Sequence, residues 1–167
     1  MSKKPLDAID LLDAEHRAVK ALFDDYRQLS DHQAGGGKRK ALAETICMLL
    51  TIHMRLEVEI FYPPVREAIR DDDLLDEAEV EHAGAKELIG QILSMQPGDE
   101  LYDAKVTVLG EYIAHHVKEE REDMFPKARK CGIDLEALGE RLHSRRRELE
   151  AVPEALREDA LVSVVSA

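Results

Sequence analysis

The chain has 167 residues, of which 44% are hydrophobic, and this is enough to bury the core of one domain. Its formal net charge of −12 at pH 7 excludes nucleic acids and anionic membranes as expected partners, because their phosphate groups would repel it. Cys47 and Cys131 form no CxxC pair, so neither a zinc knuckle nor a dithiol redox site is predicted.

The expected compartment is the cytoplasm. The first seven residues are basic, but no apolar segment follows them as it would in a secretory signal. The longest apolar run, residues 46–50, is too short to span a bilayer. Two widely separated cysteines in an acidic chain fit a reducing compartment. We therefore expect a cytoplasmic protein that binds no membrane.

Apolar residues recur three and four positions apart in four long segments, without the alternation typical of strands. The expected helices cover residues 5–30, 38–71, 74–95 and 100–130. Asp73 is a plausible N-cap of the third, and Pro63-Pro64 should kink or break the second. Long helices with short connections favour an all-α, up-down-up-down four-helix bundle.

The end of the chain has weaker signals. Asp134 is expected to cap a short extra helix that carries Leu135, Leu138 and Leu142. Residues 151–167 show no strong periodicity, which predicts a flexible tail. We therefore place one domain at residues 1–150 and a tail at residues 151–167.

Two segments share one pattern, in which a His is followed four residues later by a Glu and six residues after that by a Pro. The pairs are His53 with Glu57 and His116 with Glu120. Residues four apart lie one turn from each other on the same helix face, so both members of a pair can bind one target.

Each long helix also carries one His near its midpoint on the apolar face: His16, His53, His82 and His116. In an antiparallel bundle the midpoints lie at one level, so these imidazoles should converge with the carboxylates of Glu57 and Glu120. Metal coordination would offset the cost of burying them. Six ligands exceed the four of a structural zinc and suit two ions bridged by both carboxylates. Mixed imidazole and carboxylate ligation favours iron.

Other residues near the pattern have simpler interpretations. Tyr112, one turn before His116, could contact the site or pack in the core, and the repeat selects His116 over His115. Glu59 and Glu122 are interpreted as lying off the ligand face, His32 as a loop residue and His143 as an exposed residue of the short extra helix. Three aromatic residues are interpreted as core packing beside the kinks: Phe61, Tyr62 and Phe125.

The order His16, His53-x3-Glu57, His82, His116-x3-Glu120 resembles the hemerythrin-like (HHE cation-binding) family over about residues 6–130. Residues 132–139 are also similar to the continuation in bacterial members. The resemblance implies a four-helix bundle around a non-haem di-iron centre, oxo- or hydroxo-bridged, that reacts with dioxygen, peroxide or nitric oxide.

The match to oxygen-carrying hemerythrins is incomplete. Those proteins have His-x3-His on the third helix, whereas His82 is followed here by Lys86. They have His-x4-Asp on the fourth helix, where this chain has His116-x3-Glu120. The missing imidazole would leave an open or solvent-filled position, which argues against simple oxygen storage.

The leading hypothesis is therefore a di-iron protein that binds dioxygen, or senses oxidants or nitric oxide through a homodimer or an unidentified protein partner. An enzyme that disproportionates peroxide or reduces nitric oxide at the same centre is the alternative. Ferritin-like iron oxidation is a third, because Glu79-x2-His82 and Glu140-x2-His143 have the required spacing. A metal-free helical interaction domain is the simplest competitor.

Overall fold

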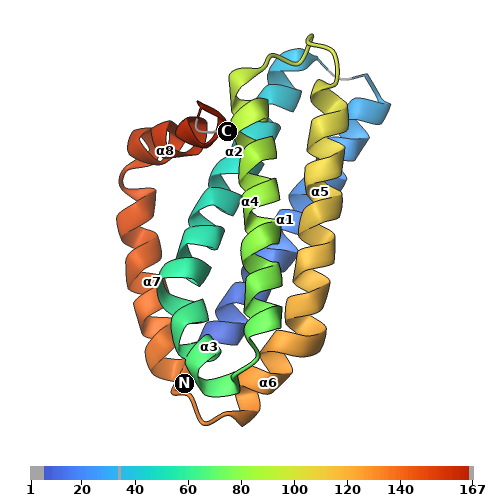
Figure 1. Cartoon of the computed structure of the whole chain (residues 1–167). Coiled ribbons are helices and arrows are strands. Elements are labelled where there is room, and N and C mark those ends of the chain that lie inside the picture. The colour runs from blue at the N-terminus through green and yellow to red at the C-terminus, as the bar shows by residue number, and fades with distance from the viewer. Residues whose placement is uncertain (1–5, 34, 166–167) are drawn as a thin grey trace, which may run out of the picture.

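The computed structural model describes residues 6–33 and 35–165, and the regular structure within these ranges is entirely helical (Figure 1). The elements are α1 (Ala8–Asp31), α2 (Gly36–Leu56), η1 (Glu57–Phe61), α3 (Tyr62–Ile69), α4 (Asp72–Ser94), α5 (Tyr102–Glu119), η2 (Glu120–Met124), α6 (Phe125–Lys130), α7 (Leu135–Glu150) and α8 (Pro153–Val165). The predicted all-α class is confirmed.

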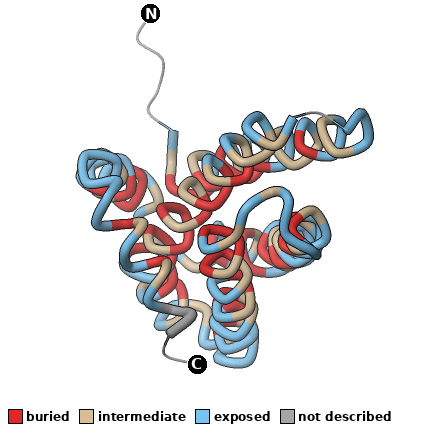
Figure 2. Tube along the Cα trace, turned by 90° about the horizontal axis from the view of Figure 1, so that it is seen from above, coloured by how far each residue is buried: buried red, intermediate tan, exposed pale blue. Residues whose placement is uncertain are grey.

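The helices α1, α2, α4 and α5 contact one another in that cyclic order. Figure 2 shows that their buried residues face a shared interior and their exposed residues face outward. The interior holds two apolar clusters. The first includes Leu12, Leu56, Phe61, Leu75 and Met124. The second includes Val19, Ile46, Leu50, Ile89 and Leu109.

A polar layer separates the two clusters. On α1, Leu12 belongs to the first cluster and Val19 to the second, with His16 between them. On α4, Ala78 and Ala85 stand in the same relation to His82. The mid-helix histidines therefore lie at one level of the molecule, as the sequence pattern predicts.

The expected kink near Pro63-Pro64 takes the form of a π-helical turn. The N–H of Tyr62 donates to the C=O of Glu57, which closes the wide turn η1 immediately before the prolines. The turn η2 repeats this geometry, since the N–H of Phe125 donates to the C=O of Glu120 ahead of Pro126. Proline cannot donate the usual helical hydrogen bond, and a wider turn absorbs the loss without ending the helix.

Helix boundaries depend on local caps. Asp71, not Asp73, caps α4, because its side chain accepts a hydrogen bond from the N–H of Leu74. Asp134 caps α7 through the N–H of Ala137, as expected. The carboxylate of Asp7 accepts from the N–H of Asp10 at the start of α1, and the earlier start expected at residue 5 lies outside the described residues.

The prediction of a flexible tail at residues 151–167 is corrected by the structure. Residues Pro153–Val165 form helix α8, which packs against α4 and α2. Among its residues with described burial, Leu156 and Ala160 are buried one turn apart and Leu161 is partly buried against the core. Arg157 lies 3.4 Å from both a Glu44 carboxylate oxygen and the C=O of Leu93. This short apolar face gives too weak a period to read from sequence, although it packs on α4 and α2. The boundary predicted at residue 150 falls between α7 and α8.

In the described ranges, no helix combines the length and the apolar character needed to cross a membrane.

Candidate metal centre

All six residues proposed from the sequence as metal ligands are buried between the helices and at most 7% exposed: His16, His53, Glu57, His82, His116 and Glu120. They come from α1, α2, η1, α4, α5 and η2, so every helix around the interior contributes. The structure brings together the whole predicted set, whereas their role as metal ligands stays a prediction.

The four imidazoles form two pairs. The Nε2 atoms of His16 and His53 lie 3.0 Å apart, and those of His82 and His116 lie 3.1 Å apart. The ring centroids are separated by 4.7 Å in both pairs, with interplanar angles of 65° and 64°. The pair from α1 and α2 therefore has the same geometry as the pair from α4 and α5.

Both carboxylates lie between the pairs. Glu57 Oε1 is 3.0 Å from His53 Nε2 and 3.4 Å from His82 Nε2. Glu120 Oε1 is 3.4 Å from His16 Nε2 and 3.0 Å from His116 Nε2. Each oxygen thus lies between the two imidazole pairs.

The nitrogen and oxygen atoms of this cluster are better satisfied by coordinating metal cations than by hydrogen bonds among themselves. One group is His16, His53, Glu57 and Glu120, and the other is Glu57, His82 and His116; within each, the ligand atoms lie within 4.8 Å of one another. Glu57 Oε1 and Glu120 Oε1 are buried and accept no well-directed hydrogen bond. Two Nε2 atoms at 3 Å can share only one proton, so cations would satisfy both kinds of atom at once.

Outer carboxylates orient two of the imidazoles. Glu15 Oε2 lies 2.7 Å from His53 Nδ1, and Arg146 holds the other oxygen of Glu15 at 2.6 Å. Glu81 Oε1 lies 3.3 Å from His116 Nδ1. A carboxylate on Nδ1 directs Nε2 toward a metal and strengthens it as a ligand.

Residues 7–128 match the hemerythrin HHE cation binding domain, and this range includes all six buried residues. The chain belongs to the hemerythrin HHE cation-binding family.

Similar proteins carry little further functional information. An uncharacterized protein of Mycobacterium tuberculosis is 23% identical over 151 residues, covering 89% of this chain and 90% of that one. A DNA nickase of Nostoc sp. is 28% identical over 127 residues, covering 76% of this chain, which thus spans only 35% of the nickase. The crystal structure of an HHE cation binding domain-containing protein of Mycobacterium kansasii has a TM-score of 0.76 at 23% identity, covering 96% and 98% of the two chains, and it shows the same fold.

Tyr62 is, with Glu15 and Glu81, a residue of this HHE domain that the sequence interpretation missed. Its hydroxyl lies 3.0 Å from Glu57 Oε2 and 3.2 Å from Glu120 Oε2. The same oxygen is 3.3 Å from His82 Nε2 and 3.1 Å from His116 Nε2. Core packing alone was therefore the wrong interpretation, because the phenol lies beside the pair where a missing imidazole predicts an open position.

The repeat contains the signal for Tyr62. It follows Glu57 by five residues, and the equivalent residue after Glu120 is Phe125, which has no hydroxyl and stacks on His16 at 5.9 Å. The two imidazole pairs thus have like geometry, and the phenol of Tyr62 lies beside only one of them.

Several other residues do not reach the centre. Tyr112 is 49% exposed and packs over Gly84, so its possible contact with the site is not made. The residues expected off the ligand face, in a loop or on the surface of the short extra helix are exposed: His32, His143, Glu59 and Glu122. The ferritin-like spacing fails, since Glu79, Glu140 and His143 are exposed as well.

The carboxylates of the site favour positive charge on the imidazole of His53. Burial by itself would lower the pKa of His53, but the carboxylates of Glu57 and Glu15 outweigh it and raise that pKa to about 10. Burial acts against the charge of Glu57 too, yet the neighbouring imidazole of His53 brings its pKa well below the ordinary range. Burial, helped by Glu120 and Glu57, raises the pKa of the Tyr62 hydroxyl. Cations entering the site would therefore displace protons from imidazoles.

Proposed function

We propose that this HHE domain is an up-down-up-down four-helix bundle that holds two non-haem iron ions and binds or senses dioxygen, peroxide or nitric oxide. The observation that supports it is the sharing of Glu57 Oε1 and Glu120 Oε1 between two like imidazole pairs. His16 and His53 would hold one ion, His82 and His116 the other, and the two carboxylates would bridge them. Imidazole with carboxylate suits iron, which supplies electron exchange with the small ligand.

The residues around the proposed ions have three different roles. Glu57 and Glu120 balance the charge of both cations, while Glu15 and Glu81 hold His53 and His116 in orientation. The hydroxyl of Tyr62 keeps a proton between the two carboxylates because burial and their charges oppose its loss. A small ligand bound beside His82 and His116 could therefore accept a hydrogen bond from the Tyr62 hydroxyl.

A cleft between α1 and α5 supports access by a small ligand. It has a volume of about 1090 Å³, and His16 lines it together with charged and apolar residues of both helices. The apolar residues are Phe23, Val106, Ile113, Ala114 and Val117. Dioxygen, nitric oxide and peroxide are all small enough to approach His16 by this route.

Peroxide disproportionation is the second candidate, and Tyr62 is the observation that favours it. Proton transfer assists cleavage of an O–O bond, and a donor held at the centre provides it.

DNA nicking is the activity in the name of the Nostoc relative, but a net charge of −12 opposes DNA binding by this chain. Sensing would require a homodimer or a protein partner to transmit the signal.

Metal analysis combined with absorption spectroscopy tests the proposal. We expect about two irons per chain in aerobically purified protein, with bands that disappear on reduction and change when oxygen is added. Persistent oxygenated bands would favour carriage, and rapid decay would favour sensing or catalysis. Continuous gas release from excess peroxide would support the enzyme, whereas a single turnover would oppose it. One zinc, or no metal after reconstitution together with a melting temperature insensitive to chelators, would overturn the di-iron proposal.

A further inference from the structure

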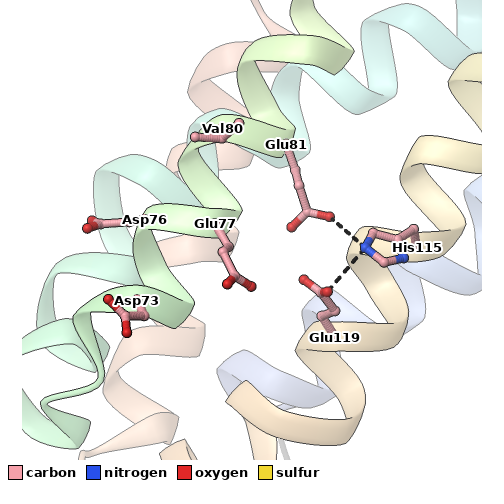
Figure 3. Close-up of a pocket in the computed structure, with 7 residues that line it drawn as sticks. All are labelled: Asp73, Asp76, Glu77, Val80, Glu81, His115 and Glu119. Atoms are coloured by element: carbon pink, nitrogen blue, oxygen red, sulfur yellow. Dashed lines mark ion pairs between the residues drawn. The ribbon is translucent and has the colours of Figure 1, made fainter.

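A second cluster of metal-ligating side chains lies on the outer side of α4 and α5. It consists of Glu81, His115 and Glu119, whose ligand atoms all lie within 4.8 Å of one another. His115 Nε2 is 3.1 Å from Glu119 Oε1 and 3.7 Å from Glu81 Oε2. Figure 3 shows Glu81 of α4 directed at the His115 ring across the space between the two helices, and Glu119 directed at the same ring from one turn along α5.

The cluster repeats the ligand pattern of the buried centre, shifted by one residue. His115 and Glu119 are four apart, as His116 and Glu120 are. One helix can therefore present one His and Glu pair inward and a second pair outward. The side chain of His115 is 66% exposed, so a cation could reach it directly from solvent.

Glu81 is held in place for this role. Its Oε1 faces Nδ1 of His116 at 3.3 Å, which fixes the carboxylate against the buried centre. Its Oε2 is buried, accepts no hydrogen bond and faces His115. A buried carboxylate oxygen without a donor is a ready ligand for a cation.

The surroundings attract cations to the cluster. A cleft of about 460 Å³ is lined by the three residues together with Val80 and a row of acidic residues on α4. The row is Asp73, Asp76 and Glu77; Figure 3 shows Glu77 directed into the space between the two helices and Asp76 directed away from His115. Lys and Arg are absent from the lining residues, but Arg66 pairs with Asp76 at 2.8 Å, so Asp73 and Glu77 are the neighbouring carboxylates that favour a cation in the cleft.

We propose that Glu81, His115 and Glu119 form a surface site for one divalent transition-metal cation, separate from the buried centre. One imidazole and two carboxylates are donors that manganese(II), iron(II) and zinc(II) accept, with water completing the coordination. The site uses none of the six buried residues, so it stands whether or not the buried centre holds iron.

Manganese(II) is a suitable probe, because the electron paramagnetic resonance signal of the free ion gives the concentration of manganese(II) that is not bound to the protein. Protein whose buried centre has been loaded with iron should bind one further manganese(II) per chain. His115→Ala and Glu119→Gln should each weaken this binding roughly tenfold or more, since loss of even an outer-layer partner costs that much in metal sites. The iron content should stay unchanged in both variants.

Two exposed residues provide matched controls. His143→Ala removes an imidazole from α7, and Glu122→Gln removes a carboxylate from η2, so both variants should bind the probe like the unaltered protein. Equal affinity in His115→Ala and the unaltered protein, or no additional manganese(II) at millimolar concentration, would overturn the proposal. If the buried centre fails to take up iron, a manganese(II) site lost only in His115→Ala and Glu119→Gln would still establish the surface site.

Discussion

The carboxylate of Glu15 lies 2.7 Å from Nδ1 of His53, and Glu81 stands in the same relation to His116 at 3.3 Å. Each of these glutamates directly precedes the histidine of its own helix, His16 or His82, and supports the histidine of the next helix. The α1–α2 and α4–α5 halves therefore repeat both their ligands and the groups that orient them.

Glu15→Gln should weaken iron binding by about 10- to 100-fold, because His53 loses the negative charge on its Nδ1 side. Competition with a chelator of known affinity would measure the change. Glu87→Gln, at an exposed position of α4, is the control and should bind iron normally. The same affinity in both variants would show that Glu15 does not support the metal ligand.

His82→Ala should lose about one of the two proposed irons per chain, because the His82 and His116 pair then keeps a single imidazole. His143→Ala should retain both, since His143 is exposed on α7. Iron analysis of the two purified variants makes the comparison. Equal iron content would contradict the ligand assignment.

Tyr62→Phe should keep the iron content and slow the reaction with peroxide by roughly 100-fold, the lower end of the effect of a positioned proton donor. The phenyl ring preserves the packing and removes only the hydroxyl between Glu57 and Glu120. Stopped-flow absorption of the reduced protein would follow the reaction. As a control, Tyr102→Phe removes a buried hydroxyl far from the centre and should react with peroxide at the rate of the unaltered protein. If Tyr62→Phe also reacts at that rate, Tyr62 is not the proton donor.

Asp103→Asn should lower the free energy of unfolding by about 1 kcal/mol, because this carboxylate links α5 to α1 and α2. It accepts from the Tyr26 hydroxyl at 2.6 Å and from Arg39 at 2.8 and 2.9 Å. Asp25→Asn, at an exposed position, should have little effect in the same urea titration.

The effect of Asp103 should also depend on pH. Burial alone would raise the pKa of Asp103, but Tyr26 and Arg39 outweigh it and lower the pKa below its ordinary value of 3.8. A lowered folded-state pKa means that the stabilisation is present above pH 3.8 and is lost as the pH falls through the folded value. The difference in the free energy of unfolding between the unaltered protein and Asp103→Asn should therefore narrow below pH 3.8. A difference that stays constant with pH would contradict the charged interaction.

The sequence by itself determined the all-helical class and the six residues that meet in the interior. A helix has 3.6 residues per turn, so a His among apolar residues at that spacing must face inward, and a Glu four residues later must accompany it. Only the tertiary structure decided which histidines pair, that Glu15 and Glu81 support His53 and His116, and that Tyr62 reaches both carboxylates. These contacts join different helices, and they depend on the rotation of each helix about its axis and on the two π-helical turns. The docking of α8 had the same origin, because Leu156 and Ala160 acquire their partners only once α4 and α2 are in place.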